Sequence, residues 1–324
     1  MLRKILVGAA ILVAAVYLWN ASWLAPAQVG ETRLIAHRGV HQNFDRTGLT
    51  NDSCTATMIR EPIVDEIENT LPAMQAAFAA GASLVELDVH PTTDGKFAVF
   101  HDWTLDCRTE GTGETRSHDM AYLKTLDVGY GYTADGGKTF LLRGKGVGMM
   151  PELSEVFAAI PNGRFLINFK SNEQREGDML RAFIEANPQF EDNIWGVYGG
   201  DAPTTRAKEL LPDLAAWSRK GLMACLLQYE GYGWTGIVPP ACHNTLVMVP
   251  INFAPWLWGW PNRFIERMRT VGSSVILIGP YSAGDPGTAG IDTPEEAALV
   301  PAKFPGLVWT NDIATIGPIV RAKN

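Results

Sequence analysis

Four short polar blocks in the N-terminal third of the chain contain the residue types of an acid–base and metal site. The blocks are His37-Arg38-Gly39, Glu68-Asn69-Thr70, Glu86-Leu87-Asp88 and His101-Asp102. The first, third and fourth directly follow apolar, strand-like runs. Because ionisable residues at the ends of strands add nothing to a strand's own stability, we interpret them as chemical groups on a barrel rim, where a metal-assisted acid–base site is built.

The carboxylates of this series are the candidate metal ligands. Glu86 and Asp88 are two residues apart on one strand, so they share a face and repel each other unless a cation lies between them. A hard divalent ion, Mg²⁺ or Ca²⁺, meets that need, and an internal salt-bridge network is the alternative. Asn168 is a further oxygen donor at the end of another strand, and Lys170 on the same face is suited to a phosphate oxygen. Glu68 is either another ligand or the cap of the helix that follows it.

The two histidines suit proton transfer near neutral pH. A single histidine at a strand end is usually structural, but His37 and His101 flank the carboxylate pair, which favours a catalytic interpretation. Arg38 offers planar, bidentate phosphate recognition, with a surface ion pair as the alternative. We interpret four further histidines as incidental: His41, His90, His118 and His243.

Strands and helices alternate from residue 32 onward. The expected strands are Arg33–His37, Ser83–Val89, Arg164–Lys170, Asn193–Tyr198, Leu214–Ser218, Leu246–Ile251, Ser274–Pro280 and Gly306–Trp309. The expected helices are Leu71–Ala80, Leu153–Ile160, Met179–Ala186, Thr204–Leu211, Arg263–Val271 and Pro294–Ala302. This pattern predicts an α/β protein with a single (β/α)₈ TIM barrel. A doubly wound sheet is the alternative, but no glycine-rich phosphate turn follows the first strand.

One segment breaks the alternation. The pattern of Phe97–His101 predicts a strand, yet only Pro91–Lys96 separates it from the preceding strand. A parallel crossover needs about a dozen residues, whereas this connection contains a turn signal. We therefore expect an antiparallel hairpin after the second barrel strand. A turn centred on Thr93-Asp94 would place His101 opposite Glu86.

Two long loops would leave the same rim as the polar blocks. Val40–Ile67 separates the first strand from its helix, and Cys107–Met150 separates the hairpin from the next helix. Loops of this length in a compact domain are usually functional, so we expect both to roof the site.

Composition limits the class of protein and its partners. The chain has 324 residues, of which 46% are hydrophobic, enough for one large core. Its 35 acidic and 27 basic residues give a net charge of −8, which argues against a nucleic-acid partner. An acidic protein that handles a phosphate needs local compensation, from a metal or from a few well-placed Arg and Lys side chains.

The N-terminus is a separate targeting segment, residues 1–27, ahead of a catalytic domain at 31–324. Arg3-Lys4 precede the uncharged stretch Ile5–Ala25, and Ala25-Pro26-Ala27 fits a signal-peptidase site. A cleaved signal and an uncleaved membrane anchor are equally compatible with this pattern, and a buried core helix is the third interpretation. Either targeting segment would export Glu31 onward to the periplasmic or extracellular side.

The cysteines agree with export. The chain has four cysteines, an even number without metal-ligand spacing. Among three possible connectivities we expect Cys54–Cys107 and Cys225–Cys242, with four free buried thiols as the alternative.

The blocks together resemble the glycerophosphodiester phosphodiesterase signature. The resemblance is strong over residues 33–113, where it adds Gly81-Ala82, Asp94-Gly95, Leu105, Arg108-Thr109 and Gly111-x-Gly113 to the four blocks. Weaker matches continue at Pro151–Val156, Asn168–Lys170 and Trp309–Asn311. It implies an irregular TIM barrel, a divalent metal, and hydrolysis of phosphodiesters such as glycerophosphocholine to an alcohol and glycerol 3-phosphate.

The resemblance also implies a role for each matching residue. His37 and His101 would be the acid–base or nucleophilic pair, and Glu86 and Asp88 metal ligands. Phosphate or substrate contacts would come from Arg38, Lys170 and Trp309. Asn168 stands where the family usually has a glutamate as third ligand. Its amide oxygen would bind the ion with one negative charge fewer, or Glu68 or the substrate's own oxygens would supply the missing ligand.

Two other functions remain open at this stage. A phospholipase D-like or lyase-type phosphodiesterase would share the histidines and the metal but form a cyclic phosphate. A catalytically silent barrel would bind a phosphorylated ligand without turnover, which the amide at Asn168 brings into consideration.

Overall fold

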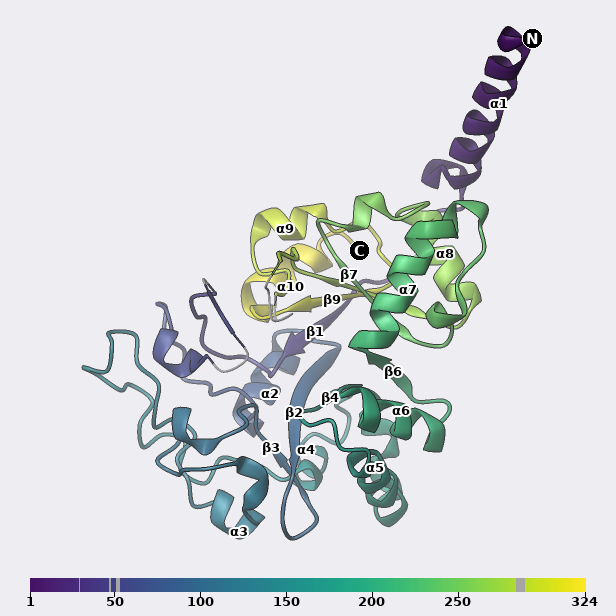
Figure 1. Ribbon diagram of the computed structural model, residues 1–324. Helices are drawn as coiled ribbons and strands as arrows, with labels where there is room; N and C mark the ends of the chain where they lie inside the picture. Colours follow the sequence, from purple (N-terminus) through teal and green to yellow (C-terminus); the bar gives the residue numbers. More distant parts are fainter. Residues whose placement is uncertain (29, 47, 51–52, 284–288) are drawn as a thin grey trace.

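The computed structural model describes residues 1–324 except 29, 47, 51–52 and 284–288, and its centre is a nearly closed parallel barrel (Figure 1). The strands are β1 (Arg33–His37), β2 (Leu84–Pro91), β4 (Phe165–Phe169), β5 (Ile194–Gly199), β6 (Ala215–Ser218), β7 (Leu246–Pro250), β8 (Ser274–Ile278) and β9 (Leu307–Thr310). Their order is β6-β5-β4-β2-β1-β9-β8-β7. The predicted irregular TIM barrel is confirmed, and each of these strands overlaps a predicted one.

Alternation along each strand separates an inner core from an outer one. On β1, Ile35 packs inside the barrel, whereas Leu34 and Ala36 pack against the surrounding helices. Leu84 starts β2 on the inside, and the period of two then directs Glu86 and Asp88 inward as well. Both carboxylates therefore lie on the inner face of a fully buried strand.

Eight helices surround the barrel. They are α2 (Leu71–Ala79), α4 (Leu153–Ala159), α5 (Arg175–Ala186), α6 (Asp201–Leu210), α7 (Arg219–Tyr232), α8 (Asn262–Thr270), α9 (Pro294–Leu299) and α10 (Ile313–Arg321). Six match predicted helices, but α7 and α10 were not expected. Gly221 and Gly231 in α7, and Gly317 and Pro318 in α10, are poor helix formers that weaken the local signal. Tertiary packing of the apolar face forms these helices nonetheless.

The hairpin after β2 is confirmed, but its predicted register is wrong by one residue. Strand β3 (Phe97–Val99) runs antiparallel to β2 with Val89 opposite Val99, so continuing the register puts His101 opposite Leu87 instead of Glu86. The turn contains one residue more than expected, because Gly95 adopts a left-handed φ of 77° and Thr92 pairs with Lys96. A shift of one residue reverses which face each side chain occupies.

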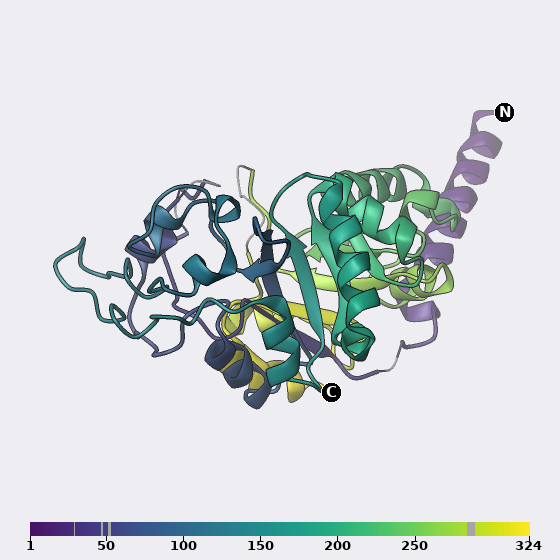
Figure 2. The same cartoon turned by 90° about the horizontal axis from the view of Figure 1, so that it is seen from below.

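The two long loops pack on each other at one end of the barrel (Figures 1 and 2). We call Cys107–Met150 the insertion segment; it contains the single-turn helix α3 (Met120–Leu123). Its Leu123 and Tyr132 share a small apolar cluster with Ala56 and Ile59 of the first loop. Residues 47 and 51–52 of that first loop lie outside the described residues.

Short 3₁₀ turns and two disulfides complete the structure. The turns are η1 (Ser22–Leu24), η2 (Thr55–Met58), η3 (Leu105–Cys107), η4 (Thr115–Ser117), η5 (Pro188–Asn193), η6 (Gly233–Thr235), η7 (Pro240–Cys242) and η8 (Ala254–Trp256). The structure contains both expected disulfides, Cys54–Cys107 and Cys225–Cys242. The first joins η2 to η3 across the two long loops, and the second joins α7 to η7.

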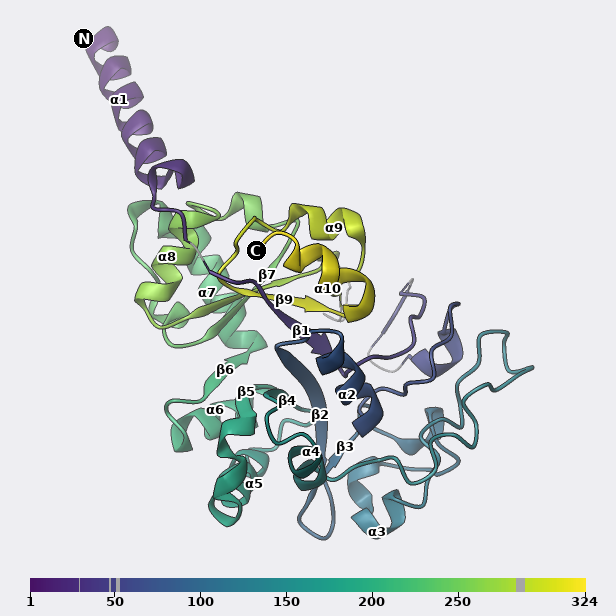
Figure 3. The ribbon, with the colours of Figure 1, turned by 180° about the vertical axis from the view of Figure 1, so that it is seen from behind.

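The N-terminal helix α1 (Leu2–Asn20) extends away from the barrel. It is long and apolar enough to cross a membrane, and nearly all of its side chains are exposed. In all three ribbon views α1 and the insertion segment lie at opposite ends of the molecule (Figures 1, 2 and 3). This arrangement excludes the interpretation of α1 as a buried core helix.

Candidate active site

The chain turns sharply after β1, and the turn directs two functional side chains into one site. His37 ends the strand, Arg38 follows with a left-handed φ of 58°, and Gly39 has a φ of 86°. A Cβ on Gly39 would lie 2.7 Å from the backbone of Ala73, so only glycine fits there. Asn69 shares the left-handed conformation, with a φ of 59°. Such strained positions cluster at functional sites.

Asp88 is the centre of a buried polar network. Its Oδ2 accepts a hydrogen bond from Nδ2 of Asn69 at 2.9 Å and lies 3.1 Å from Nε of Arg38. Its Oδ1 accepts from Nδ2 of Asn168 at 2.8 Å and lies 3.5 Å from Nζ of Lys170. Burial opposes ionisation of Asp88, but Lys170 and Arg38 hold its pKa well below the usual range. Asp88 is therefore an anion partly balanced by side chains of the protein.

Glu86 lies on the same inner face but has weaker positive surroundings. Tyr198 donates its hydroxyl to Oε1 of Glu86 at 2.5 Å, and Nε2 of His37 lies 3.6 Å from Oε2. Burial and the neighbouring Asp88 raise the pKa of Glu86 to about 8. Without a further cation, Glu86 therefore holds a proton through much of the neutral range.

This raised pKa predicts a pH-dependent stability that Glu86→Gln removes. Because the folded protein binds the proton more tightly than the unfolded chain, whose glutamate has a pKa of 4.5, the stabilisation is present below pH 4.5 and is lost as pH rises through about 8. We expect the Tm measured in EDTA to fall between about pH 5 and 8. Glu86→Gln should flatten that fall, and an unchanged slope would contradict the assignment.

Glu68 pairs with two arginines instead of capping a helix. Helix α2 begins after Thr70, so Glu68 lies outside its first turn. Its Oε1 accepts from Nη1 of Arg38 at 3.0 Å, and its Oε2 lies 3.1 Å from Nη1 of Arg108. Burial raises the pKa of Glu68, but the charges of Arg108 and Arg38 outweigh the effect of burial. The pKa of Glu68 is therefore lowered overall. Both oxygens of Glu68 thus already face positive charges.

His37 is oriented from behind by an amide. Its Nδ1 lies 2.6 Å from Oδ1 of Asn311, which in turn donates Nδ2 to Oδ2 of Asp292 at 2.7 Å. An amide oxygen accepts only, so Nδ1 carries the proton and Nε2 is left for chemistry. Trp309 is buried with its ring centroid 5.0 Å from that of His37. Burial, followed by the charge of Arg38, holds the pKa of His37 well below its usual range.

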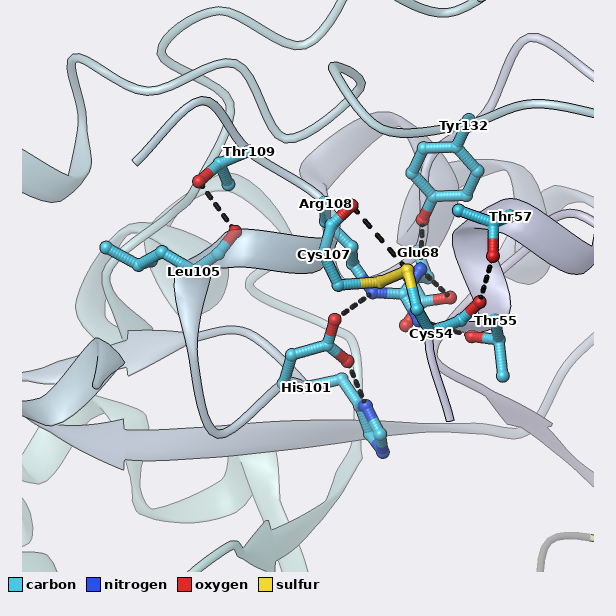
Figure 4. Close-up of a disulfide and its surroundings, with 11 residues drawn as sticks. Cys54, Thr55, Thr57, Glu68, His101, Leu105, Cys107, Arg108, Thr109 and Tyr132 are labelled. Carbon is cyan, nitrogen blue, oxygen red and sulfur yellow. Dashed lines mark hydrogen bonds and ion pairs between the residues drawn. A yellow bond between two sulfur atoms is a disulfide. The ribbon is translucent and has the colours of Figure 1, made fainter. Parts of the chain in front are cut away.

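His101 has the same arrangement with a carboxylate partner. Its Nδ1 lies 2.6 Å from Oδ1 of Asp102, and Nε of Arg108 donates to Oδ2 of Asp102 at 2.9 Å (Figure 4). Its side chain is 22% exposed, against 4% for His37, so His101 borders solvent. Burial, followed by the charges of Arg38 and Lys170, holds the pKa of His101 well below its usual range. Both histidines are therefore neutral and present an unprotonated Nε2.

The structure brings most of the expected residues together and adds some that were missed. Asp102, Arg108 and Asn311 belong to the quoted motifs but had no assigned role. Tyr198 and Asp292 had no motif at all. Tyr198 ends a predicted strand, so its position at the barrel rim was a usable signal. Two histidines interpreted as incidental are buried nearby: the ring of His41 lies 6.0 Å from that of His37, and His90 approaches the carbonyl of His101.

The donor set for a metal consists of two carboxylates and an amide. In the described part of the chain, no group of three or more His, Cys, Asp or Glu side chains is placed to hold a metal ion. Glu86 and Asp88 face the same side, and Asn168 contacts Asp88 through its amide. Carboxylate and amide oxygens are the ligands of Mg²⁺ and Ca²⁺, so these three residues fit a hard cation in their chemistry.

A pocket of about 240 Å³ adjoins the His37 side of the site. Its lining includes Arg46 and Arg60 of the first loop together with Asp292 and Asn311. Because Asn311 binds His37, the pocket lies next to the orienting partner of one candidate catalytic residue.

Sequence comparison relates the first half of the domain to known enzymes. A model of the Glycerophosphoryl diester phosphodiesterase family matches residues 37–187. A glycerophosphodiester phosphodiesterase from Caldanaerobacter subterraneus subsp. tengcongensis is 37% identical over 155 residues, 48% of this chain and 50% of the relative. A human lysophospholipase D is 34% identical over 138 residues, 41% of either chain. The matched region thus spans half or less of these two relatives.

Solved structures show the same fold across nearly the whole chain. The glycerophosphodiester phosphodiesterase of Agrobacterium tumefaciens has a TM-score of 0.58 at 17% identity, covering 89% of this chain and 99% of that one. A glycerophosphoryl diester phosphodiesterase domain from Mycobacterium tuberculosis has a TM-score of 0.62 at 16% identity, covering 89% and 98%. An Oleispira antarctica phosphodiesterase, solved with the product sn-glycerol-3-phosphate, has a TM-score of 0.54 at 18% identity, covering 90% and 97%.

Proposed function

We propose that the chain is a member of the glycerophosphoryl diester phosphodiesterase family and hydrolyses glycerophosphodiesters to an alcohol and glycerol 3-phosphate. One observation carries the proposal. His37 and His101, each oriented through Nδ1, lie close to a buried site in which Arg38 and Lys170 supply positive charge. The product bound to the Oleispira antarctica relative supports this product class.

The two neutral histidines suit a two-step proton transfer. One Nε2 accepts the proton of the attacking hydroxyl or water, and the other histidine donates a proton to the departing alkoxide. The negative charge of a bound phosphate favours protonation of one of them. Arg38 and Lys170 would stabilise the charge that develops on the phosphoryl oxygens. Acid–base assistance of this kind contributes about 10²–10⁴-fold.

A divalent metal, Mg²⁺ or Ca²⁺, is the proposed cofactor. Glu86, Asp88 and the amide oxygen of Asn168 would hold it, and it would supply charge stabilisation at the phosphoryl group. Asn168 now directs its nitrogen at Asp88, and a half-turn of the amide presents the oxygen instead. We favour Asn168 over Glu68 as the third ligand, because Asn168 contacts Asp88 directly, whereas the oxygens of Glu68 lie next to Arg38 and Arg108.

The experiment is a glycerophosphocholine assay with product identification, with and without EDTA. Choline and glycerol 3-phosphate, formed only when Mg²⁺ or Ca²⁺ is present, are the expected result. A cyclic glycerol phosphate would favour the lyase-type alternative. Binding of glycerol 3-phosphate without any turnover would favour a silent barrel, and activity that survives EDTA would contradict the metal proposal.

Asn168→Glu should strengthen metal binding and lower the stability of the metal-free protein. The new carboxylate adds one negative charge to the proposed ligand set and removes the hydrogen bond that Asn168 donates to Asp88. We expect a lower metal dissociation constant by isothermal titration calorimetry and a lower Tm in EDTA, because the half-buried new carboxylate would then repel the buried Asp88. Asn168→Gln, which keeps the amide, is the control. Weaker metal binding by Asn168→Glu would contradict the ligand assignment.

We also propose that α1 is an uncleaved anchor of an exported protein. Its last residue, Asn20, is buried and accepts a hydrogen bond from Nη1 of Arg267 on α8 at 3.0 Å. Asn20 also donates to the carbonyl of Trp234 at 2.8 Å, and Nε1 of Trp19 donates to that of Thr235. Cleavage after Ala27 would remove all of these contacts from the folded domain. The two disulfides support export to an oxidising compartment.

N-terminal sequencing of the mature protein distinguishes the two targeting forms. We expect Met1 or Leu2 as the first residue, with the protein in the membrane pellet after an alkaline carbonate wash. Asn20→Leu should keep that location but lower the Tm, because Arg267 then loses one of its buried hydrogen-bond acceptors. A mature protein that begins at Gln28 would establish a cleaved signal.

A further inference from the structure

Arg108 is a buried arginine that the proposed reaction does not use. Only 2% of its surface is exposed, and it lies on the chain just after η3. Its Nε donates to Asp102, its Nη1 to the hydroxyl of Tyr132 at 2.6 Å, and its Nη2 to Oγ1 of Thr55 at 2.6 Å. Figure 4 shows the side chains of Tyr132 and Thr55 converging on the guanidinium group of Arg108. The partners thus come from three separate segments of the rim.

One of these contacts leads to His101. Asp102 uses one oxygen for Nε of Arg108 and the other for Nδ1 of His101. The carboxylate is therefore held from both sides, and its orientation determines that of the imidazole. Burial opposes the charge of Arg108, but Asp102 and Glu68 raise its pKa well above the usual range, so the guanidinium stays charged.

The remaining contacts hold Arg108 in place. Oε2 of Glu68 lies 3.1 Å from Nη1 of Arg108, which also donates to the hydroxyl of Tyr132. Nη2 donates to Oγ1 of Thr55. The Cys54–Cys107 disulfide lies directly beside this cluster, because its cysteines are the chain neighbours of Thr55 and Arg108. The bond thus ties together the two segments that carry the arginine and one of its partners.

We propose that Arg108 is a positioning residue that acts on His101 through Asp102, and that the Cys54–Cys107 disulfide keeps it in register. The inference rests on the proposed function, in which His101 transfers a proton. In this proposal Arg108 acts without contacting the substrate or the metal. Arg108 therefore determines the fraction of molecules in which the His101 imidazole is oriented toward the reacting atoms.

The kinetic test is a double-mutant cycle with glycerophosphocholine. Arg108→Gln and Asp102→Asn should each lower kcat by about 10- to 100-fold, with KM changed less than twofold, because misorientation affects turnover and not binding. The double variant should be no slower than Asp102→Asn alone. If Arg108→Gln lowered kcat by the same factor in the wild type and in Asp102→Asn, or left kcat unchanged, the proposal would be overturned. Arg143→Gln, an exposed arginine of the same insertion segment, is the matched control and should match the wild type.

A second readout does not depend on activity. The proton between Nδ1 of His101 and Asp102 should give a downfield ¹H NMR signal that disappears in His101→Gln and in Asp102→Asn. Arg108→Lys keeps the charge but not the fork, so the folded variant should show this signal shifted, with the Nδ1 signal of His37 as internal reference. An unshifted signal would overturn the proposal. If the wild-type protein does not turn over glycerophosphocholine, the proposed function is refuted. The NMR measurement then still tests whether Arg108 orients His101 through Asp102.

The two disulfides provide a matched pair for the second part. Cys54→Ala/Cys107→Ala should lower kcat and shift the His101 signal in the same direction as Arg108→Lys. Cys225→Ala/Cys242→Ala removes the bond between α7 and η7 and should change neither. Equal effects from both pairs, or none from the first, would refute the role of the Cys54–Cys107 bond.

Discussion

Alanine at His101 or at His37 is expected to lower kcat for glycerophosphodiester hydrolysis by about 10²–10⁴-fold each. Each substitution removes an imidazole whose Nδ1 is held by an acceptor at 2.6 Å, leaving Nε2 for the substrate. The loss should appear in kcat, because Arg38 and Lys170, the proposed phosphate contacts, are unchanged. Steady-state kinetics with a choline-release assay measures both parameters.

The control for these substitutions is His243→Ala. His243 is exposed, and its contact is the carbonyl of Val238, so full activity is expected. Imidazole added to the His101→Ala enzyme should restore part of the rate more readily than for His37→Ala, since His101 borders solvent. Wild-type rates in either alanine variant would refute the assignment of that histidine.

Arg38→Met is expected to be the most destabilising substitution, costing about 3–5 kcal/mol of unfolding free energy. The guanidinium lies 3.1 Å from Asp88 and 3.0 Å from Glu68, and all three side chains are at most 5% exposed. Its removal leaves two buried carboxylates facing each other without the cation between them. Activity should also fall, because the site loses a positive charge that is proposed to face the phosphoryl group.

Urea denaturation of the wild type, Arg38→Met and Arg206→Met measures this effect. Arg206 forms ion pairs with Asp178 and Glu209 on the surface, where the loss should be about 0–1 kcal/mol. Added Mg²⁺ or Ca²⁺ should restore part of the stability of Arg38→Met if the carboxylates can bind the ion. Equal losses from the two arginine substitutions would show that Arg38 does not stabilise the buried carboxylates.

The strand pattern and the motif blocks could be predicted from the sequence because they depend on residues that are close together in the chain. Every barrel strand overlaps its predicted range, and the short connection Pro91–Lys96 correctly required a hairpin. The period of two along β2 correctly placed Glu86 and Asp88 on one inner face. Both disulfide pairings also followed from position in the chain.

The register of the hairpin was the first feature that local reasoning missed. A left-handed glycine at Gly95 lengthens the turn by one residue, and no composition signal distinguishes that turn from a shorter one. Consequently His101 lies beside Asp102 and Arg108, and the histidine that reaches Glu86 is His37.

By itself, the sequence determined the barrel, the four polar blocks and the chemistry that their residue types allow. The tertiary structure decided which charges meet: Arg38 lies between Asp88 and Glu68, Tyr198 donates to Glu86, and Arg108 holds Asp102. Local patterns fix elements because period and turn length act over a few residues. Partners separated by many residues, such as Glu86 and Tyr198, meet only when the closing barrel brings the ends of distant strands together.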